Sequence, residues 1–151
     1  MDATYFYMAL VVGLCVSLLI DEVFGVSTGG MIVPAYLSMI CDDLQQMLLI
    51  FIVALAIYLI VRYVLPHFVI LFGRRKFVAT LIVGVIIKLV LELLFPAFAP
   101  FAAIEIRGIG VITPSLIANG CSKQGFRYTI PAVLIATYIT FFIVSVLFWV
   151  F

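Results

Sequence analysis

The sequence has very few charged residues. Of its 151 residues, 10% are charged and 68% are hydrophobic, and the net charge is +1. A soluble domain is about half apolar and a quarter charged. Because so few charges cannot cover a surface that faces water, lipid must cover much of the exterior. The near-zero net charge excludes a basic field for nucleic acid and an acidic tail.

The motifs that hold metals, nucleotides or catalytic groups are also missing. The single histidine, His67, follows Pro66, and the sequence has no P-loop, no G-x-S-x-G and no H-E-x-x-H. The three cysteines, Cys15, Cys41 and Cys121, form no C-x-x-C pair, and we interpret them as small apolar residues. The sequence therefore predicts a non-catalytic chain without metal or cofactor.

The first apolar stretch has no cationic region before it. Asp2 is the only charge there, and no A-x-A cleavage site follows. This pattern favours a retained membrane anchor over a cleaved signal peptide.

Four apolar stretches are long enough to cross a bilayer as helices, which takes about 20 residues. They run from Tyr5 to Ile20 with an extension to Phe24, from Met47 to about Leu65, from Phe77 to Phe95, and from about Tyr128 to Phe151. Barrel strands would show about ten alternating residues each. We predict an all-α membrane protein with four transmembrane helices and two short re-entrant or broken helices.

Basic residues in short loops predict the orientation. Arg74, Arg75 and Lys76 form the densest cluster, between the second and third spans. The positive-inside rule puts this loop in the cytoplasm, and with four spans both termini would be cytoplasmic too. Three cations in the last long loop oppose this assignment: Arg107, Lys123 and Arg127.

Two halves of the chain resemble each other. Leu10–Gly13 resembles Leu81–Gly84, 71 residues later, and at that offset Asp21 matches Glu92. Gly30–Pro34 matches Gly110–Pro114 at an offset of 80, as Gly-x-Ile-x-Pro. We predict one multi-pass domain (1–151) made of two repeat units, about 1–76 and about 77–151.

The two Gly-x-Ile-x-Pro segments belong to apolar runs too short to cross, Met31–Cys41 and Val111–Ala118. Such runs are re-entrant or interfacial more often than spanning. Paired Gly/Pro-interrupted segments in corresponding places indicate a binding site or pathway, and ordinary surface loops are the alternative. Re-entrant pieces would make the units parallel, whereas crossing pieces would give each unit three spans and an inverted repeat.

Ionisable residues within the membrane are functional candidates, and the predicted ones are Asp21, Glu22, Lys88, Glu92 and Glu105. Asp21, with Glu22 beside it, ends a stripe of small residues in the first span, which predicts helix packing and keeps Asp21 away from lipid. Lys88 and Glu92 lie one helical turn apart in the third span and can pair, either functionally or structurally. Arg62 is closer to an interface, and we expect it to snorkel.

The segment Glu105–Gly110 combines Arg107 with flexible glycines. If a short helix starts after Gly110, its free N–H groups and Arg107 suit a carboxylate or phosphate. A structural pair of Arg107 with Glu105 or Asp21 is the alternative. Asn119-Gly120 is typical of a helix C-cap or turn. The predicted anion-contact residues are Gly30, Pro34, Arg107, Gly108, Gly110, Pro114 and Asn119.

Three strings in this order resemble the PgsC/CapC family, the small membrane subunit of poly-γ-glutamate synthase. They are Gly30–Leu37, Leu71–Phe77 with its Gly-Arg-Arg-Lys-Phe, and Arg107–Asn119 with its Arg-Gly-Ile-Gly…Pro…Ile-Ala-Asn. The likeness covers nearly the whole chain. Thr113 and Ser115 flank Pro114 where an apolar residue and a glycine are expected.

The resemblance implies a multi-pass subunit of the cell membrane that carries no ligase chemistry. Its partners would be a cytoplasmic ATP-dependent amide ligase, PgsB or CapB, and a membrane-anchored extracytoplasmic subunit, PgsA or CapA. The complex makes polyglutamate and moves it outward. Arg74, Arg75 and Lys76 would dock the ligase or the growing polyanion, and Arg107 would meet carboxylates. A small secondary transporter or channel with Glu92 as coupling acid is the rival, and a pure scaffold is a third possibility.

Overall fold

The computed structural model describes residues 3–68, 70, 73–94 and 107–150, and every regular element in these ranges is helical. The elements are α1 (Ala3–Phe24), α2 (Ile32–Met39), α3 (Leu44–Leu59), the π-helical turn η1 (Ile60–Val64), α4 (Leu65–Phe68), α5 (Arg74–Leu94), α6 (Arg107–Gln124) and α7 (Phe126–Val150). Four helical stretches are long and apolar enough to span a membrane: Thr4–Phe24, Leu44–Phe68, Arg74–Leu94 and Phe126–Val150. The predicted all-α fold with four long apolar helices is confirmed.

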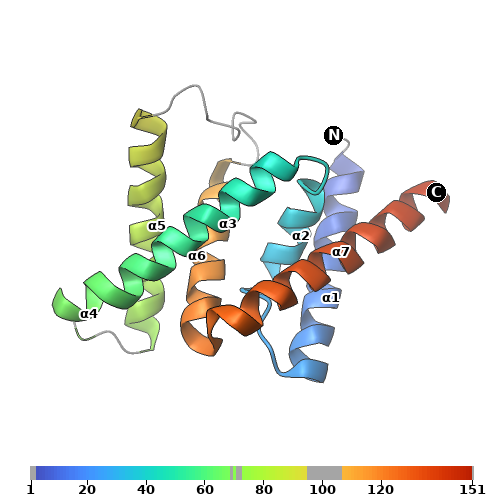
Figure 1. Cartoon of the computed structure of the whole chain (residues 1–151). Helices are drawn as coiled ribbons and strands as arrows, with labels where there is room; N and C mark the ends of the chain where they lie inside the picture. The colour runs from blue at the N-terminus through green and yellow to red at the C-terminus, as the bar shows by residue number, and fades with distance from the viewer. Residues whose placement is uncertain (1–2, 69, 71–72, 95–106, 151) are drawn as a thin grey trace.

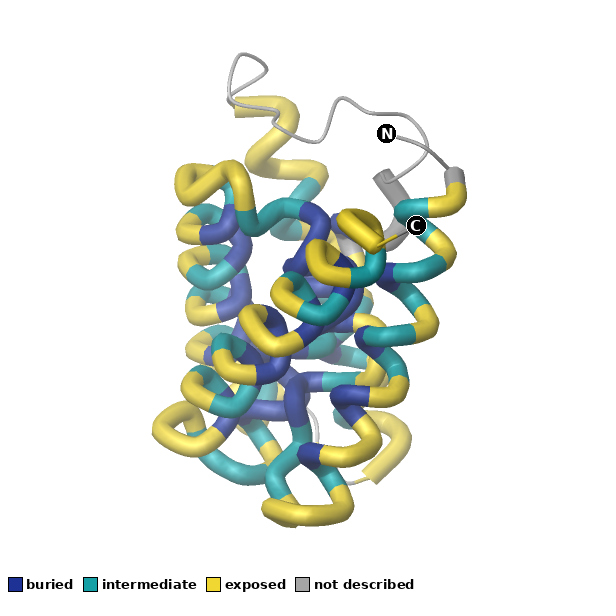
Figure 2. Tube along the Cα trace, turned by 90° about the vertical axis from the view of Figure 1, so that its right-hand side faces the viewer, coloured by how far each residue is buried: buried dark blue, intermediate teal, exposed yellow. Residues whose placement is uncertain are grey.

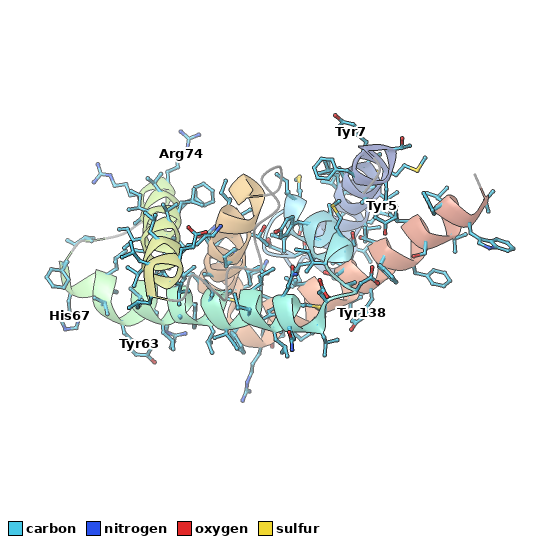
Figure 3. The ribbon with its side chains drawn as sticks, turned by 90° about the horizontal axis from the view of Figure 1, so that it is seen from above. Tyr5, Tyr7, Tyr63, His67, Arg74 and Tyr138 are labelled. Atoms are coloured by element: carbon cyan, nitrogen blue, oxygen red, sulfur yellow. The ribbon has the colours of Figure 1, made fainter. Side chains whose placement is uncertain are left out.

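The helices form two layers. One layer holds α5, α6, α2 and α1 side by side, and α3 and α7 cross in front of it on a diagonal (Figures 1 and 3). The helix α3 packs on α6 and α5, and α7 packs on α2 and α1. The last long helix of each half of the chain therefore covers the other half.

The chain passes through the molecule in alternating directions. Ala3 and Val150 lie at one end, whereas the α4–α5 junction and the α6–α7 turn lie at the other (Figure 1). The 18 residues of α6 extend about 27 Å at 1.5 Å per residue. With four passes, both ends of the chain were expected on the side of the α4–α5 junction. In the structure, the ends lie on the opposite side, because α6, and α2 with its preceding link, each carry the chain back across.

The buried side chains lie where the two layers meet. Leu37 on α2, Ile50 and Ile57 on α3, Ile117 on α6 and Val133 on α7 have 1% or less of their surface exposed. Figure 2 shows that the buried residues line the inner sides of the helices and the exposed residues their outer sides. Large apolar side chains cover those outer sides, which is the pattern of a surface that contacts lipid.

Two glycines permit the closest helix contacts. A Cβ atom at Gly13 of α1 would lie 2.5 Å from the Cβ of Ala35 on α2, and a Cβ atom at Gly84 of α5 would collide with the Ser115 hydroxyl of α6. These are corresponding positions of the proposed repeat, because Gly84 follows Gly13 at the offset of 71 and Ser115 follows Ala35 at the offset of 80. The duplication stays a prediction, and the passes of the two units run in opposite directions (Figure 1), as in the inverted alternative.

Candidate functional site

The short helix α2 meets α6 in the middle of the back layer. Gly29 and Gly30 have φ angles of +77° and +126°, a region that glycine adopts readily, and they turn the chain into α2. A Cβ atom at Gly120 of α6 would lie 2.9 Å from the Cα of Gly29. The predicted contact residue Gly30 therefore lies at the start of α2, next to Leu116 of α6.

The two prolines of the Gly-x-Ile-x-Pro segments have different surroundings. Pro34 is the third residue of α2, where a helix needs no N–H donor. Pro114 lies inside α6 and cannot donate a helical hydrogen bond to the carbonyl of Gly110. The sequence motif is shared, but only the second copy leaves a backbone acceptor without its helical donor.

The helix α6 begins earlier than predicted. It starts at Arg107 and not after Gly110, so the free N–H groups of its first turn belong to residues 107–110. Gly108 and Gly110 are helical, and Glu105 lies outside the described residues. The free N–H groups in the first turn of α6 can bind an anion. The Gly110 carbonyl, which lacks its helical donor, instead favours a hydrogen-bond donor or a cation.

The predicted cap at Asn119-Gly120 is wrong. Both residues lie inside α6, and Asn119 is 8% exposed. The helix ends at Gln124, followed by Gly125 with φ +94°, and the Gly125 N–H donates to the Cys121 carbonyl at 2.9 Å. The signal for this ending was Gly125 itself, since glycine is the preferred residue just after a helix.

Polar groups connect the link between α1 and α2 to α1 and to the end of α6. The Ser17 and Thr28 hydroxyls are hydrogen-bonded at 2.5 Å. The Gln124 side chain accepts from the Ser27 N–H at 2.7 Å and donates to the Gly25 carbonyl at 3.4 Å. The predicted Asp21 lies nearby on the last turn of α1, and its Oδ1 atom is buried without a hydrogen-bond partner among the described residues. Sequence reasoning missed the roles of Thr28 and Gln124.

The predicted pairing of Lys88 with Glu92 is confirmed. The Lys88 Nζ and Glu92 Oε1 atoms are 3.7 Å apart, and the two side chains are 12% and 41% exposed. The adjacent face of α5 packs on α6 through Thr80 and Gly84, which are buried. The lysine therefore lies largely within the helix pair, and the carboxylate lies toward its edge.

The charged residues separate by end. Among the described residues, six cations lie toward the end that holds the α4–α5 junction and the α6–α7 turn: Arg62, Arg74, Arg75, Lys76, Lys123 and Arg127. Asp21 and the exposed Glu22 are the acids at this end. Asp42, Asp43 and Glu92 lie toward the opposite end, where α6 begins at Arg107. Arg74, Arg75 and Lys76 form the first turn of α5, which corrects their expected place in a loop.

Comparison with known proteins gives one family. The family described as capsule biosynthesis CapC matches residues 12–130. The PGA biosynthesis protein CapC of Bacillus subtilis (strain 168) is 42% identical over 140 residues, which are 93% of each chain. The capsule biosynthesis protein CapC of Bacillus anthracis is 41% identical over the same shares. No solved structure matches.

Proposed function

Since the chain belongs to the CapC family of capsule biosynthesis proteins, we propose that it is the membrane subunit of a poly-γ-glutamate synthesis and export complex. It docks the cytoplasmic ligase at its basic end and helps the polyanion cross the membrane. The observation that carries this proposal is the separation of charge between the two ends of the molecule.

The docking role rests on the first turn of α5. Arg74 and Arg75 are exposed, and Lys76 is half-buried. Cations in the first turn of a helix oppose its dipole and cost about 0.3–1 kcal/mol each. Helix stability therefore does not account for them, whereas an acidic partner surface does. We assign that surface to the ligase subunit of the PgsB/CapB type.

The transport role rests on the electrostatic field between the basic end and the acidic end of the molecule. Cations at the ligase end raise the local concentration of a polyanion, and the acids at the other end repel it once it has crossed. Within the layer of α5, α6 and α2, Lys88 and the first turn of α6 offer intermediate contacts for side-chain carboxylates. An anchored subunit of the PgsA/CapA type would meet the end where Ala3 and Val150 lie.

Replacing Arg74, Arg75 and Lys76 together with glutamine tests the docking. We expect the ligase to be lost from the purified complex while the membrane abundance of the chain is retained. The matched control replaces Arg62, Lys123 and Arg127, which removes the same charge from the same end. Equal recovery of ligase with both variants would refute docking at α5.

A small secondary transporter is the second candidate, favoured by the Lys88–Glu92 pair within a span and by the opposite directions of the two halves (Figure 1). Transporters of this kind bind substrate near the repeat interface. Purified chain in liposomes should then move a small ion without partners, and Glu92→Gln should abolish the movement. Ion movement that persists in Glu92→Gln would exclude Glu92 as the coupling acid.

A further inference from the structure

Arg62 occupies an unusual place in the span Leu44–Phe68. It is exposed, and it lies in the π-helical turn η1, six residues before the span ends. An arginine at this depth directs its guanidinium toward the headgroup region. A side chain that only snorkels has no fixed protein partner, whereas Arg62 has one.

A tyrosine holds the guanidinium in place. The Nη1 group of Arg62 donates a hydrogen bond to the Tyr58 hydroxyl, and its Cζ atom lies 5.6 Å from the centre of the Tyr58 ring. Tyr58 is 7% exposed, and its ring lies 6.3 Å, between centroids, from that of Phe126. Phe126 is the first residue of α7, so these contacts connect Arg62 to the start of α7.

The local backbone departs from a regular helix at the same point. Pro66 has no N–H, so the Arg62 carbonyl receives no helical bond from it, and the Leu65 N–H reaches back five residues to the Ile60 carbonyl. Single π-helical turns inside α-helices are often found at functional sites. The irregular turn and the fixed guanidinium therefore coincide at one residue.

A second guanidinium and two tyrosines directly follow the residues of these contacts in the sequence. Arg127 follows Phe126 and is exposed. Tyr63 and Tyr128 are 65% and 67% exposed, and tyrosine is enriched at membrane–water interfaces. Figure 3 shows that Tyr63 points outward from the face that also carries Tyr138, away from the back layer. Tyr63, next to Arg62, therefore lies on the outer, lipid-contacting face, beside the junction of η1 and α7 that the Arg62–Tyr58–Phe126 contacts form.

We propose that Arg62 and Arg127 bind the phosphodiester headgroup of an anionic phospholipid at the junction of η1 and α7. Tyr58 occupies one of the five N–H donors of Arg62, and the others remain for phosphate oxygens, which the planar guanidinium binds in pairs. Among the described residues, neither arginine has a carboxylate within ion-pair distance. Exposed apolar side chains of α3 and α7, among them Leu55, Leu59 and Ile135, offer a surface for the acyl chains.

A lipid suits this position better than the polymer does. The site opens sideways into the membrane and is flanked by interfacial tyrosines, whereas a polymer that crosses the membrane would contact the end of the molecule. Anionic lipids of the inner leaflet gather at basic segments near that surface. This inference rests on the Arg62–Tyr58–Phe126 contacts and does not depend on the proposed function.

Native mass spectrometry of the detergent-purified chain, titrated with phosphatidylglycerol or phosphatidylcholine, tests the site. The unmodified chain should retain phosphatidylglycerol in preference. Arg62→Gln and Arg127→Gln should each lower its affinity roughly tenfold, Arg62→Lys nearly as much, and Tyr58→Phe by a few-fold because it removes only the hydroxyl. Arg75→Gln, with the same charge loss at the same end, should have no effect. Circular dichroism confirms that each variant is folded.

Three results would overturn the proposal. Equal retention of the two lipids would exclude a headgroup site. Equal losses in Arg62→Gln and Arg75→Gln would mean nonspecific attraction to the basic end. Displacement of phosphatidylglycerol by poly-γ-glutamate that depends on Arg62 would reassign the site to the polymer. Because Arg62→Lys keeps the charge and the long side chain, its result distinguishes loss of the paired hydrogen bonds from misfolding.

Discussion

A methyl group at Gly13 tests how closely α1 and α2 pack. In Gly13→Ala the new Cβ would lie 2.5 Å from the Cβ of Ala35, 2.6 Å from its Cα and 2.8 Å from its backbone nitrogen. Ordinary contacts begin near 3.5 Å, and no rotation of a side chain moves a backbone atom. The two helices must therefore separate, which costs about 1–3 kcal/mol in overpacked cores, against about 1 kcal/mol gained in helix propensity. Because backbone atoms clash, the cost belongs to the upper part of that range, about 2–3 kcal/mol, and we expect a net loss of about 1–2 kcal/mol.

At the corresponding glycine in the second half, Gly84, we expect a second substitution to restore stability more fully. At Gly84 the added Cβ meets first the hydroxyl of Ser115 and then its Cβ at 3.1 Å. Gly84→Ala should destabilise the chain, and Ser115→Ala should restore most of that loss. Ala35→Gly should restore only part of the loss in Gly13→Ala, because the Cα of Ala35 still lies 2.6 Å from the new methyl.

The assay is thermal unfolding in detergent of each single variant, the two double variants and the unmodified chain, which completes two double-mutant cycles. A Gly13→Ala protein as stable as the unmodified chain would refute the close packing of α1 on α2. Equal rescue in both pairs would refute the distinction between a backbone clash and a hydroxyl clash.

Four further outcomes are expected. Cys41 precedes α3 at the end opposite the basic residues, so in a chain whose other cysteines are serine a membrane-impermeant maleimide should label it from outside intact cells; labelling only after lysis would refute the orientation that puts the basic end in the cytoplasm. Burial and Asp42 raise the pKa of the Cys41 thiol, so its labelling should be slow at neutral pH and accelerate as rising pH forms the thiolate. For Lys88 and Glu92, each single neutralisation should lower stability more than the double, with a coupling of about 0.5–3 kcal/mol; additive losses would mean that the two groups act separately. Arg107→Ala should lower exported polymer at unchanged membrane abundance, and normal export would remove Arg107 from the pathway.

Hydropathy predicted the four long helices because lipid contacts most of their outer residues. It did not predict the extent of α6, which holds Thr113, Pro114, Ser115 and Asn119 and has a polar sequence for a membrane helix. The reason is position: α6 packs on α2, α3, α5 and α7, so protein satisfies groups that lipid could not. A scale of transfer free energies into lipid applies to side chains that face lipid, and few side chains of α6 do so.

The candidate site was predictable only where partners are close in sequence. Lys88 and Glu92 lie four residues apart on one helix, and their pairing followed from that spacing. The hydrogen bonds of Gln124 to Gly25 and Ser27 join residues almost 100 positions apart. Nothing in a single sequence indicates which of many polar residues meet at that distance. The polar connection between α6 and the link that follows α1 therefore came from the structure alone.

The position of α7 on α1 and α2 has a consequence for biogenesis. The ribosome makes α7 after α1 and α2, and α7 covers both of them. Until α7 has been made, the sides of α1 and α2 that bear Val16 and Met39, which pack with Ala136 and Val144 of α7, lack their cover and stay open to lipid, to quality-control proteases or to another nascent chain. Assembly therefore closes from α7 back onto α1, and a chain truncated before Phe126 would insert into the membrane without completing its first half.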